Sequence, residues 1–125
     1  MWPVTEKYFR DMLVSKRPDL LEDFTAPDPQ GGLPLFLADD DAETLLSLSL
    51  RKEQKLIWVT GVLGKGLKGL RHMKKFGLEN GYEWIGFKVR IGSEAWGKGI
   101  VRYSKARLMV ETSTGNEYCA SLHSR

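Results

Sequence analysis

The sequence predicts an α+β (α/β) fold in which a mixed, mostly antiparallel central sheet contains one βαβ crossover. An apolar, β-rich run at 56–60 is followed by a glycine-containing turn, a basic segment with helical spacing and a second apolar run at 82–91. Strand, helix and strand in this order are typical of a parallel pair joined by a crossover helix. Apolar runs at 33–51 and 108–123, each interrupted by turn residues, add antiparallel hairpins.

The chain of 125 residues has the length of one domain with a single core, and we expect residues 1–125 to form it. Hydrophobic residues make up 42% of it and four are tryptophans, which is typical of a folded globular protein. The single cysteine, Cys119, cannot form an internal disulfide, which favours a reducing compartment. We recognise no signal-peptide pattern and no apolar run of membrane-spanning length, so we expect a soluble cytoplasmic protein.

The first elements are two short helices between residues 5 and 24. Thr5 is placed to cap the first helix, because its hydroxyl can accept a hydrogen bond from a backbone N–H of the first turn. Pro18 is costly inside a helix and suits a first helical position, so we expect a second helix to start there. Residues 25–32 contain two prolines and two glycines and are expected to form a loop.

A hairpin is predicted next, with strands at 33–38 and 44–51 joined through Asp39-Asp40-Asp41. Leucines alternate with Ser47 and Ser49 in the second strand, so we expect the leucines to be buried and both serines to face solvent. Three consecutive aspartates raise the question of a metal site. The remaining positions of a calcium-binding loop are missing, so a solvated turn is the prediction.

The centre of the chain combines a buried strand, the glycine turn Gly61–Gly66 and a helix that starts near Leu67. This layout presents unpaired backbone N–H groups and a positive helix end to an anion, and glycine lets a phosphate approach closely. The spacing fits neither the Walker A motif nor the dinucleotide-binding fingerprint. The alternative is a glycine turn that connects two elements and binds nothing.

The basic helix carries one apolar stripe and ends at Asn80-Gly81, a typical C-terminal cap. The strand at 82–91 follows, and Ser93 is expected to cap a further helix that runs to Arg107. On this helix Trp96, Ile100 and Tyr103 share one face. The last hairpin is expected to turn at residues 113–116.

Charge is divided unevenly along the chain. Residues 1–50 contain 4 Lys and Arg against 10 Asp and Glu, whereas residues 51–125 contain 15 against 6. We expect a polarised surface whose basic part serves either a phosphate-bearing cofactor or nucleic acid.

Several kinds of catalytic site lack support in the sequence. His72, His123 and Cys119 do not have the spacing of metal ligands, so no metal is expected. A nucleophile elbow is absent, and Cys119 has no evident histidine partner. Hydrolytic catalysis is therefore not indicated.

Taken together, the element order and three motifs resemble the GNAT superfamily of acetyl-CoA-dependent N-acetyltransferases. The stretch LGKGLKGL is similar to the glycine-rich turn that holds the CoA diphosphate in that family. ENGYEWIGFKV is similar to the entry of its fifth strand, and the segment from Tyr103 to Leu108 resembles Tyr-x-x-x-Gly-Phe. The sequence departs from the family motif in either register. In the preferred register Gly61 replaces an Arg or Gln, and in the other Leu63 replaces the Arg and Lys68 the last Gly. Downstream, Arg107-Leu108 replace Gly-Phe.

The resemblance implies acetyl-CoA as co-substrate and an amine, of a small molecule or a protein, as acceptor. Tyr103 would be the general acid. The alternative is that Tyr103 only packs in the core. Glu43, Glu83 or a water would be the base. We expect Gly64→Val to weaken CoA binding and to leave the fold largely intact. The implied CoA-binding residues are Val59, Thr60, Gly61, Val62, Leu63, Gly64, Lys65 and Gly66.

Two other functions remain open. The chain also resembles small GNAT-like proteins of bacteriophages, some of them virion-associated, because its CoA motif is eroded and its first strand is reduced to residues 1–4. Such a protein would be catalytically silent. A basic nucleic-acid-binding module with exposed Trp84 and Trp96 is the third possibility. An open, V-shaped gap between the strands at 56–60 and 82–91 would favour the enzyme.

Overall fold

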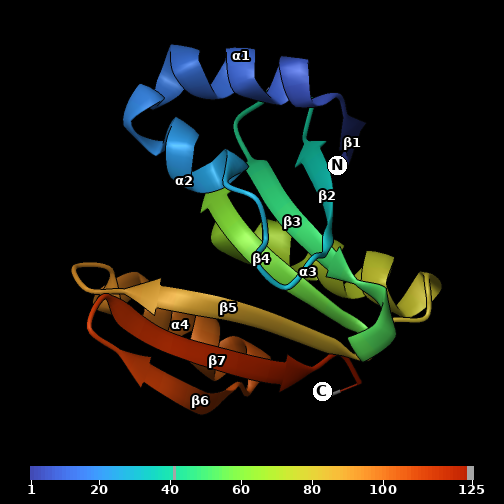
Figure 1. Cartoon of the computed structure of the whole chain (residues 1–125), viewed down its shortest axis with the longest axis vertical. Coiled ribbons are helices and arrows are strands. Elements are labelled where there is room, and N and C mark those ends of the chain that lie inside the picture. Colours follow the sequence, from blue (N-terminus) through green and yellow to red (C-terminus); the bar gives the residue numbers. More distant parts are fainter. Residues whose placement is uncertain (41, 124–125) are drawn as a thin grey trace.

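The computed structural model describes residues 1–40 and 42–123, and Figure 1 shows one twisted sheet with helices on both faces. Seven strands of the described residues form the sheet in the order β1-β2-β3-β4-β5-β7-β6. Only β4 and β5 pair in parallel, and the other neighbours are antiparallel. The predicted mixed, mostly antiparallel α+β fold with a βαβ crossover is therefore confirmed. The strands are β1 (Trp2–Val4), β2 (Leu33–Ala38), β3 (Leu45–Arg51), β4 (Leu56–Leu63), β5 (Trp84–Arg90), β6 (Arg107–Thr112) and β7 (Gly115–Ser121).

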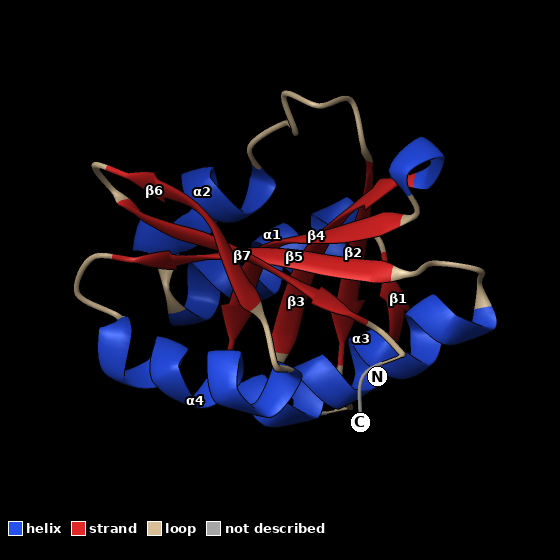
Figure 2. Cartoon of the chain, turned by 90° about the horizontal axis from the view of Figure 1, so that it is seen from below, coloured by secondary structure: helices blue, strands red, loops and turns tan. Residues whose placement is uncertain are grey.

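The helices cover the sheet in two pairs, with α1 and α2 on one face and α3 and α4 on the other (Figures 1 and 2). Thr5 caps α1 as predicted, because its Oγ1 accepts a hydrogen bond of 3.1 Å from the N–H of Tyr8. Pro18 starts a short 3₁₀ turn that leads into α2. None of the helices in the described chain is long and apolar enough to cross a membrane. The helices are α1 (Glu6–Lys16), α2 (Leu21–Thr25), α3 (Gly66–Glu79) and α4 (Glu94–Ser104), with 3₁₀ turns η1 (Pro18–Leu20) and η2 (Lys52–Gln54).

The β2–β3 hairpin forms in the predicted register, but the expectation that Ser47 and Ser49 face solvent was wrong. Both serines are only 3% exposed. The Ser47 hydroxyl donates to the backbone carbonyl of Phe24, and the Ser49 hydroxyl donates to Asp28 Oδ2. Helix α2 and the loop after it cover this face of the sheet, so the polar half of the alternating pattern is buried and hydrogen-bonded.

Asp39 also differs from the predicted solvated turn, because its side chain is buried at the end of β2. One carboxylate oxygen accepts from the N–H of Thr44 at 3.1 Å and the other from Lys68 Nζ of α3 at 3.0 Å. Burial alone would raise the pKa of Asp39, but the hydrogen bonds from Thr44 and Lys68 outweigh it and lower that pKa. The predicted turn residue Asp41 lies outside the described residues.

Strand β4 is longer than predicted and takes up the first part of the expected glycine turn. Gly61 lies inside the strand, beneath α2, where a Cβ would stand 2.5 Å from the Phe24 ring. The turn itself contains only Gly64 and Lys65 before α3 begins. The glycine pattern therefore serves two separate purposes, close packing at Gly61 and chain reversal at Gly64.

Beyond β5, the chain forms α4 and then the β6–β7 hairpin, with β7 inserted between β5 and β6. Ser93 precedes α4 as predicted, but its side chain makes no cap hydrogen bond. Glu94 closes this turn instead, because its Oε2 accepts from the N–H of Gly92 at 2.9 Å. Gly97 lets α4 pack closely, since a Cβ there would lie 2.3 Å from Val89 Cγ1. The side chain of Trp96 lies outside the described part of the chain.

The core has two parts, one on each face of the sheet. The larger part packs between the sheet and helices α3 and α4, with Ile57, Met73 and Ile100 among its buried members. The smaller part lies under α1, where the rings of Phe9 and Phe36 stand 4.8 Å apart.

Candidate functional site

The parallel strands β4 and β5 pair over only half of their length. Register pairs run from Leu56↔Trp84 to Val59↔Phe87, and none follows. Residues 60–63 of β4 and 88–90 of β5 continue as strands without pairing to each other, and the two strands spread apart (Figure 1). This is the V-shaped gap that was expected of an enzyme with this fold.

A β-bulge lies at the start of the gap. Ser47 of β3 pairs with Gly61 and Leu48 pairs with Val59, so Thr60 is the extra residue on β4. A bulge leaves its extra residue out of the hydrogen-bond ladder and redirects the local backbone. Thr60 therefore has no register partner on β3 or on β5.

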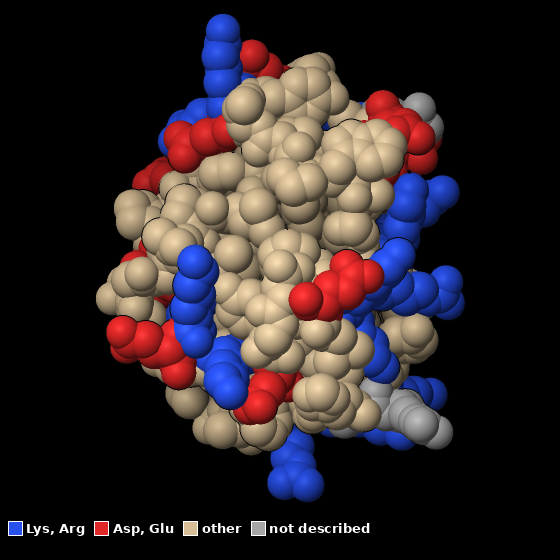
Figure 3. All heavy atoms as spheres, turned by 90° about the vertical axis from the view of Figure 1, so that its right-hand side faces the viewer, with Lys and Arg blue, Asp and Glu red and all other residues tan. Residues whose placement is uncertain are grey.

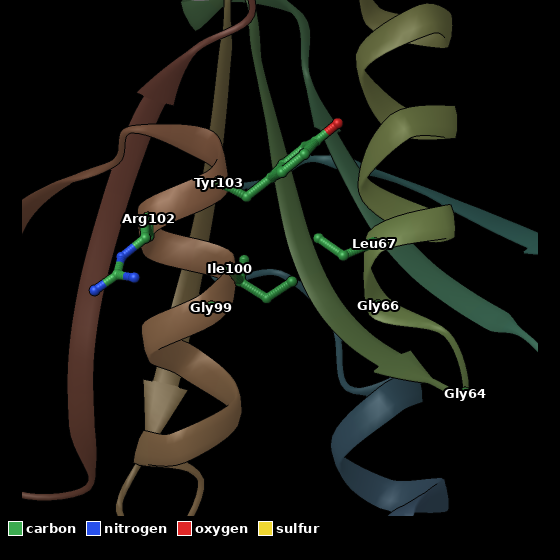
Figure 4. A pocket seen from close by; sticks show the side chains of 7 residues that line it. All are labelled: Gly64, Gly66, Leu67, Gly99, Ile100, Arg102 and Tyr103. Carbon is green, nitrogen blue, oxygen red and sulfur yellow. The ribbon is translucent and has the colours of Figure 1, made fainter.

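On one face of the sheet, helices α3 and α4 enclose a groove of about 530 Å³ beside the gap. Figure 4 shows Leu67 and Ile100 pointing toward each other across it, with Arg102 turned away. The groove reaches the glycine turn at the N-terminus of α3, where backbone N–H groups and the helix dipole favour an anion. Its lining residues are Gly64, Gly66, Leu67, Gly99, Ile100, Arg102 and Tyr103.

Gly64 is fixed by the fold as well as by its place in the groove. Its φ is +97°, and a Cβ would lie 2.1 Å from the carbonyl oxygen of Glu43. The next N–H, that of Lys65, donates to Thr44 Oγ1 at 3.3 Å. The expectation that valine at Gly64 leaves the fold intact was therefore wrong, because only glycine fits this turn.

Tyr103 extends from α4 toward α3 over the groove (Figure 4). The side chain is 48% exposed, so the alternative of a core residue is excluded. Its hydroxyl accepts a hydrogen bond of 3.3 Å from Arg71 Nε, and the guanidinium carbon lies 5.9 Å from the ring centre. Arg71 thus orients the hydroxyl, and no pattern in the sequence indicated this contact.

A second cavity, of about 330 Å³, opens at the gap on the side of α1 and α2. Val59 to Leu63, five of the predicted CoA-binding residues, line this cavity, whereas Gly64 and Gly66 line the groove. Lys65 lines neither of the two, and its ammonium lies 3.9 Å from Glu43 Oε2. The remaining lining residues are Arg17, Leu20, Asp23, Phe24, Phe87, Lys88, Arg90 and Ser93.

The glutamates considered as bases lie away from this cavity. Glu83 stands at the paired end of β5, 3.8 Å from Lys55, and Glu43 lies beside Lys65 at the start of α3. Asp23 is the one carboxylate among the residues that line the second cavity, and its Oδ2 accepts from Arg90 Nη1 at 2.8 Å. Neither glutamate therefore lines the second cavity.

Cysteine and metal chemistry find no support in the described residues. Burial raises the pKa of Cys119, so this thiol is a poor source of thiolate. Residues 1–40 and 42–123 contain no group of three His, Cys, Asp or Glu side chains placed to hold a metal ion.

Some site residues were missed by the sequence analysis for identifiable reasons. Gly99 lies four positions before Tyr103 on α4, so helical spacing from Tyr103 would have found it. Arg102 directly precedes Tyr103, and helical spacing does not mark it. The second cavity includes Arg17, Asp23 and Arg90 in its lining only because α2 packs over the gap. No local pattern marks them.

Comparison with known proteins gives structural matches but no sequence match. No protein-family sequence model matches the chain, and no curated protein sequence matches it. A Klebsiella pneumoniae protein assigned to the acyl-CoA N-acyltransferases aligns with a TM-score of 0.64 and 12% identity over 97% of this chain and 95% of its own. A GNAT-family acetyltransferase of Staphylococcus aureus aligns with a TM-score of 0.59 and 11% identity over 97% of both chains.

A third similar structure contains coenzyme A. The PaiA N-acetyltransferase of Thermoplasma acidophilum, solved in complex with coenzyme A, aligns with a TM-score of 0.60 and 11% identity over 94% of this chain and 80% of its own. At identities this low the structural alignments establish the fold alone, because one fold can carry many different activities. The order of strands, the single parallel pair that spreads apart and these alignments together give the chain the fold of the GNAT N-acetyltransferases.

Proposed function

We propose that the protein is an N-acyltransferase that moves an acetyl group from acetyl-CoA to an amine. The observation that carries this proposal is the gap between β4 and β5, with an apolar groove on one face of the sheet and a polar cavity on the other. Two substrates can then approach one bond from opposite sides, and positioning of this kind accounts for much of the rate of a group transfer.

The groove suits the CoA chain in shape and chemistry. Leu67, Ile100 and Gly99 offer an apolar wall to a flexible pantetheine arm, and the first turn of α3 offers N–H groups to the diphosphate. Coenzyme A in the PaiA structure, which has the same fold, supports this assignment.

The chemical step requires few protein groups. The lone pair of a neutral amine attacks the thioester carbonyl carbon, a C–N bond forms and the C–S bond breaks, and sulfur leaves with the electron pair. The N–H of Thr60 would stabilise the oxygen as it becomes negative, because the bulge keeps this residue out of both ladders. Tyr103 would give its proton to the thiolate, and a water would take the proton lost by nitrogen.

Gly99 offers a test of the groove that spares the fold, because a Cβ built there meets nothing within 4 Å. We expect Gly99→Phe to fill the groove and abolish acetyl-CoA binding in calorimetric titration, with thermal unfolding unchanged or raised. Gly99→Ala is the matched control, since it adds one methyl group, favours the helix by about 1 kcal/mol and should keep binding. Equal affinity of all three proteins would place CoA elsewhere, and absence of binding to wild type would refute the proposal.

A catalytically silent binding protein is the second candidate. It is favoured by Gly61 at a position that is Arg or Gln in the preferred register of the family motif. For a silent binding protein we expect the Gly99 variants to change acetyl-CoA affinity in the same way. We expect no amine to release free thiol from acetyl-CoA.

A further inference from the structure

The cavity on the α1 and α2 side of the gap is lined by more cations than carboxylates. Arg17 reaches it from the end of α1, and Lys88 and Arg90 reach it from β5, whereas Asp23 of α2 is the single carboxylate in its lining. An acceptor that enters this cavity therefore meets a positive potential. This rests on the proposed function, since it concerns the acceptor in the same reaction.

The hydrogen bonds of these cations show which of them can meet a ligand. Asp23 and Arg90, joined at 2.8 Å, link α2 to β5, and both also line the neighbouring hollow under the loop at 26–30. Arg17 donates two hydrogen bonds, of 3.0 and 2.8 Å, to Asp19 outside the cavity. Lys88 instead donates to the neutral hydroxyl of Thr114, and its cross-strand neighbour on β7 is Glu117.

Such a field affects both ends of an acceptor. Near several cations the neutral form of a bound amine is favoured over its ammonium form, which helps nitrogen attack without a carboxylate base. A second ammonium on the same molecule is repelled, whereas a carboxylate or phosphate is attracted and can accept charge-assisted hydrogen bonds. The cavity volume of about 330 Å³ is at the small end of ligand sites, which favours a small molecule over a protein segment.

We propose that the acceptor is a small primary amine that carries its own anionic group, a carboxylate or a phosphate, held by Lys88 beside the Asp23–Arg90 pair. The acidic first half of the chain would by itself attract a cationic amine. In the folded chain, however, Asp23 is already paired with Arg90 at the cavity.

Four acceptors test the proposal, three of them built on the 2-aminoethanol frame and the fourth a linear polyamine. Ethanolamine has no anionic group, serine adds a carboxylate, phosphoethanolamine adds a phosphate, and spermidine adds further cations. With acetyl-CoA present, we expect kcat/KM for serine or phosphoethanolamine to exceed that for ethanolamine at least about tenfold, as one charge-assisted hydrogen bond allows. Preference between the two anionic acceptors distinguishes carboxylate from phosphate. A higher kcat/KM for ethanolamine or spermidine would overturn the proposal.

Binding measured in the presence of CoA separates this inference from the proposed function. If no acceptor releases thiol but serine or phosphoethanolamine still binds more tightly than ethanolamine, the transferase proposal fails and the anion site stands. If all four bind equally, the anion site is refuted whatever the turnover.

Two substitutions at one position locate the effect. We expect Lys88→Gln to reduce the preference for the anionic acceptors about tenfold, and Lys88→Glu to favour spermidine. Lys52→Gln makes the same change of charge in the turn before β4, outside the cavity, and should leave the preference unchanged. Equal effects of Lys88→Gln and Lys52→Gln would show that total charge, and no site, sets the preference. Thermal unfolding of each variant checks that the fold is kept.

Discussion

At the scale of single residues, Tyr103 separates an enzyme from an inert relative. Its hydroxyl stands over the groove and accepts from Arg71, so Tyr103→Phe removes a proton donor while keeping the ring. We expect turnover, measured as thiol release, to fall about 100-fold with little change in acetyl-CoA affinity. Tyr8→Phe, at an exposed tyrosine on α1, is the control. Full activity of the Tyr103→Phe variant would show that Tyr103 has no acid role.

Gly64 gives a second prediction at this scale, because two constraints coincide there. Gly64 and Gly81 both have positive φ, but a Cβ at Gly81 meets nothing within 4 Å, whereas one at Gly64 meets the Glu43 carbonyl. We expect Gly81→Ala to cost about 1 kcal/mol of unfolding free energy and Gly64→Ala about 3 kcal/mol or more. Denaturant titration of both variants measures the difference, and equal costs would mean that the contact with Glu43 relaxes freely.

At the scale of elements, the loop at 26–32 is attached to β3 by one buried carboxylate. Asp28, with a side chain only 5% exposed, accepts two hydrogen bonds from Arg51, at 2.8 and 3.0 Å, and one from Ser49. Arg51 in turn lies over the Trp58 ring, 4.9 Å from its centre. This network holds the loop over the second face of the sheet, where it lines the hollow next to the acceptor cavity.

We expect Asp28→Asn to lower the free energy of unfolding at pH 7 by about 3 kcal/mol, because Arg51 is then left buried without its partner. Asp19→Asn, in an exposed pair with Arg17, should change stability far less. The comparison uses denaturant unfolding of both variants. Similar small losses would show that the Asp28 network contributes nothing beyond a surface pair.

The same network makes stability depend on acid pH. Hydrogen bonds from Arg51 lower the pKa of Asp28, against the opposing effect of burial, and Ser49 adds to the lowering. A carboxyl with a lowered pKa stabilises the fold above its unfolded pKa of about 3.9, and this contribution is lost as pH falls toward the folded value. We therefore expect wild type to lose its advantage over Asp28→Asn below about pH 4, measured as unfolding free energy against pH. A constant difference down to about pH 2 would contradict this.

At the scale of the whole molecule, ion pairs reduce the charge division seen along the sequence. Among the residues that the structure describes, four pairs join a carboxylate of the first 50 residues to a cation of the remaining chain. Figure 3 shows Lys and Arg gathered along one flank of an uncharged face, with Asp and Glu at several separate places. The expected polarised surface is thus only partly present, because folding brings the two halves into contact. These pairs are Asp28–Arg51, Glu43–Lys65, Asp39–Lys68 and Asp23–Arg90.

This pairing leads us to expect weak binding of nucleic acid. Random oligonucleotides should bind no more tightly than about 1 μM at physiological salt, because carboxylates of residues 1–50 already neutralise part of the positive charge of residues 51–125. Fluorescence anisotropy across a salt series measures this. Sub-micromolar binding with a steep salt dependence would instead favour a nucleic-acid-binding function.

A ligand that binds only the folded chain must also stabilise it. At a concentration of about 100 times its dissociation constant, acetyl-CoA should add about 2.7 kcal/mol, which corresponds to a rise in Tm of roughly 10 °C for a chain of this size. Thermal unfolding with acetyl-CoA, and with adenosine diphosphate as a control that lacks the pantetheine arm, tests whether the apolar groove is used. Equal shifts with both ligands would place the interaction at the diphosphate alone.

Local sequence patterns were enough to predict the helices and strands and their order along the chain. Periodicity, the Thr5 cap, Pro18 and the Asn80-Gly81 stop depend on contacts within a few residues, so local chemistry suffices to predict them. The crossover from β4 to β5 followed because a helix between two strands leaves few alternatives. The glycine turn was found from its residue pattern and Tyr103 from the resemblance to the GNAT superfamily, and both lie on one groove.

Which faces of these helices and strands are buried depends on the tertiary structure. Ser47 and Ser49 follow a solvent-facing pattern, yet they are buried because α2 and its loop cover their side of the sheet. The loss of pairing after Val59 and the cations around the acceptor cavity depend on residues far apart in the chain. Such contacts form only when separate segments pack together, and no pattern of neighbouring residues encodes which segments those will be.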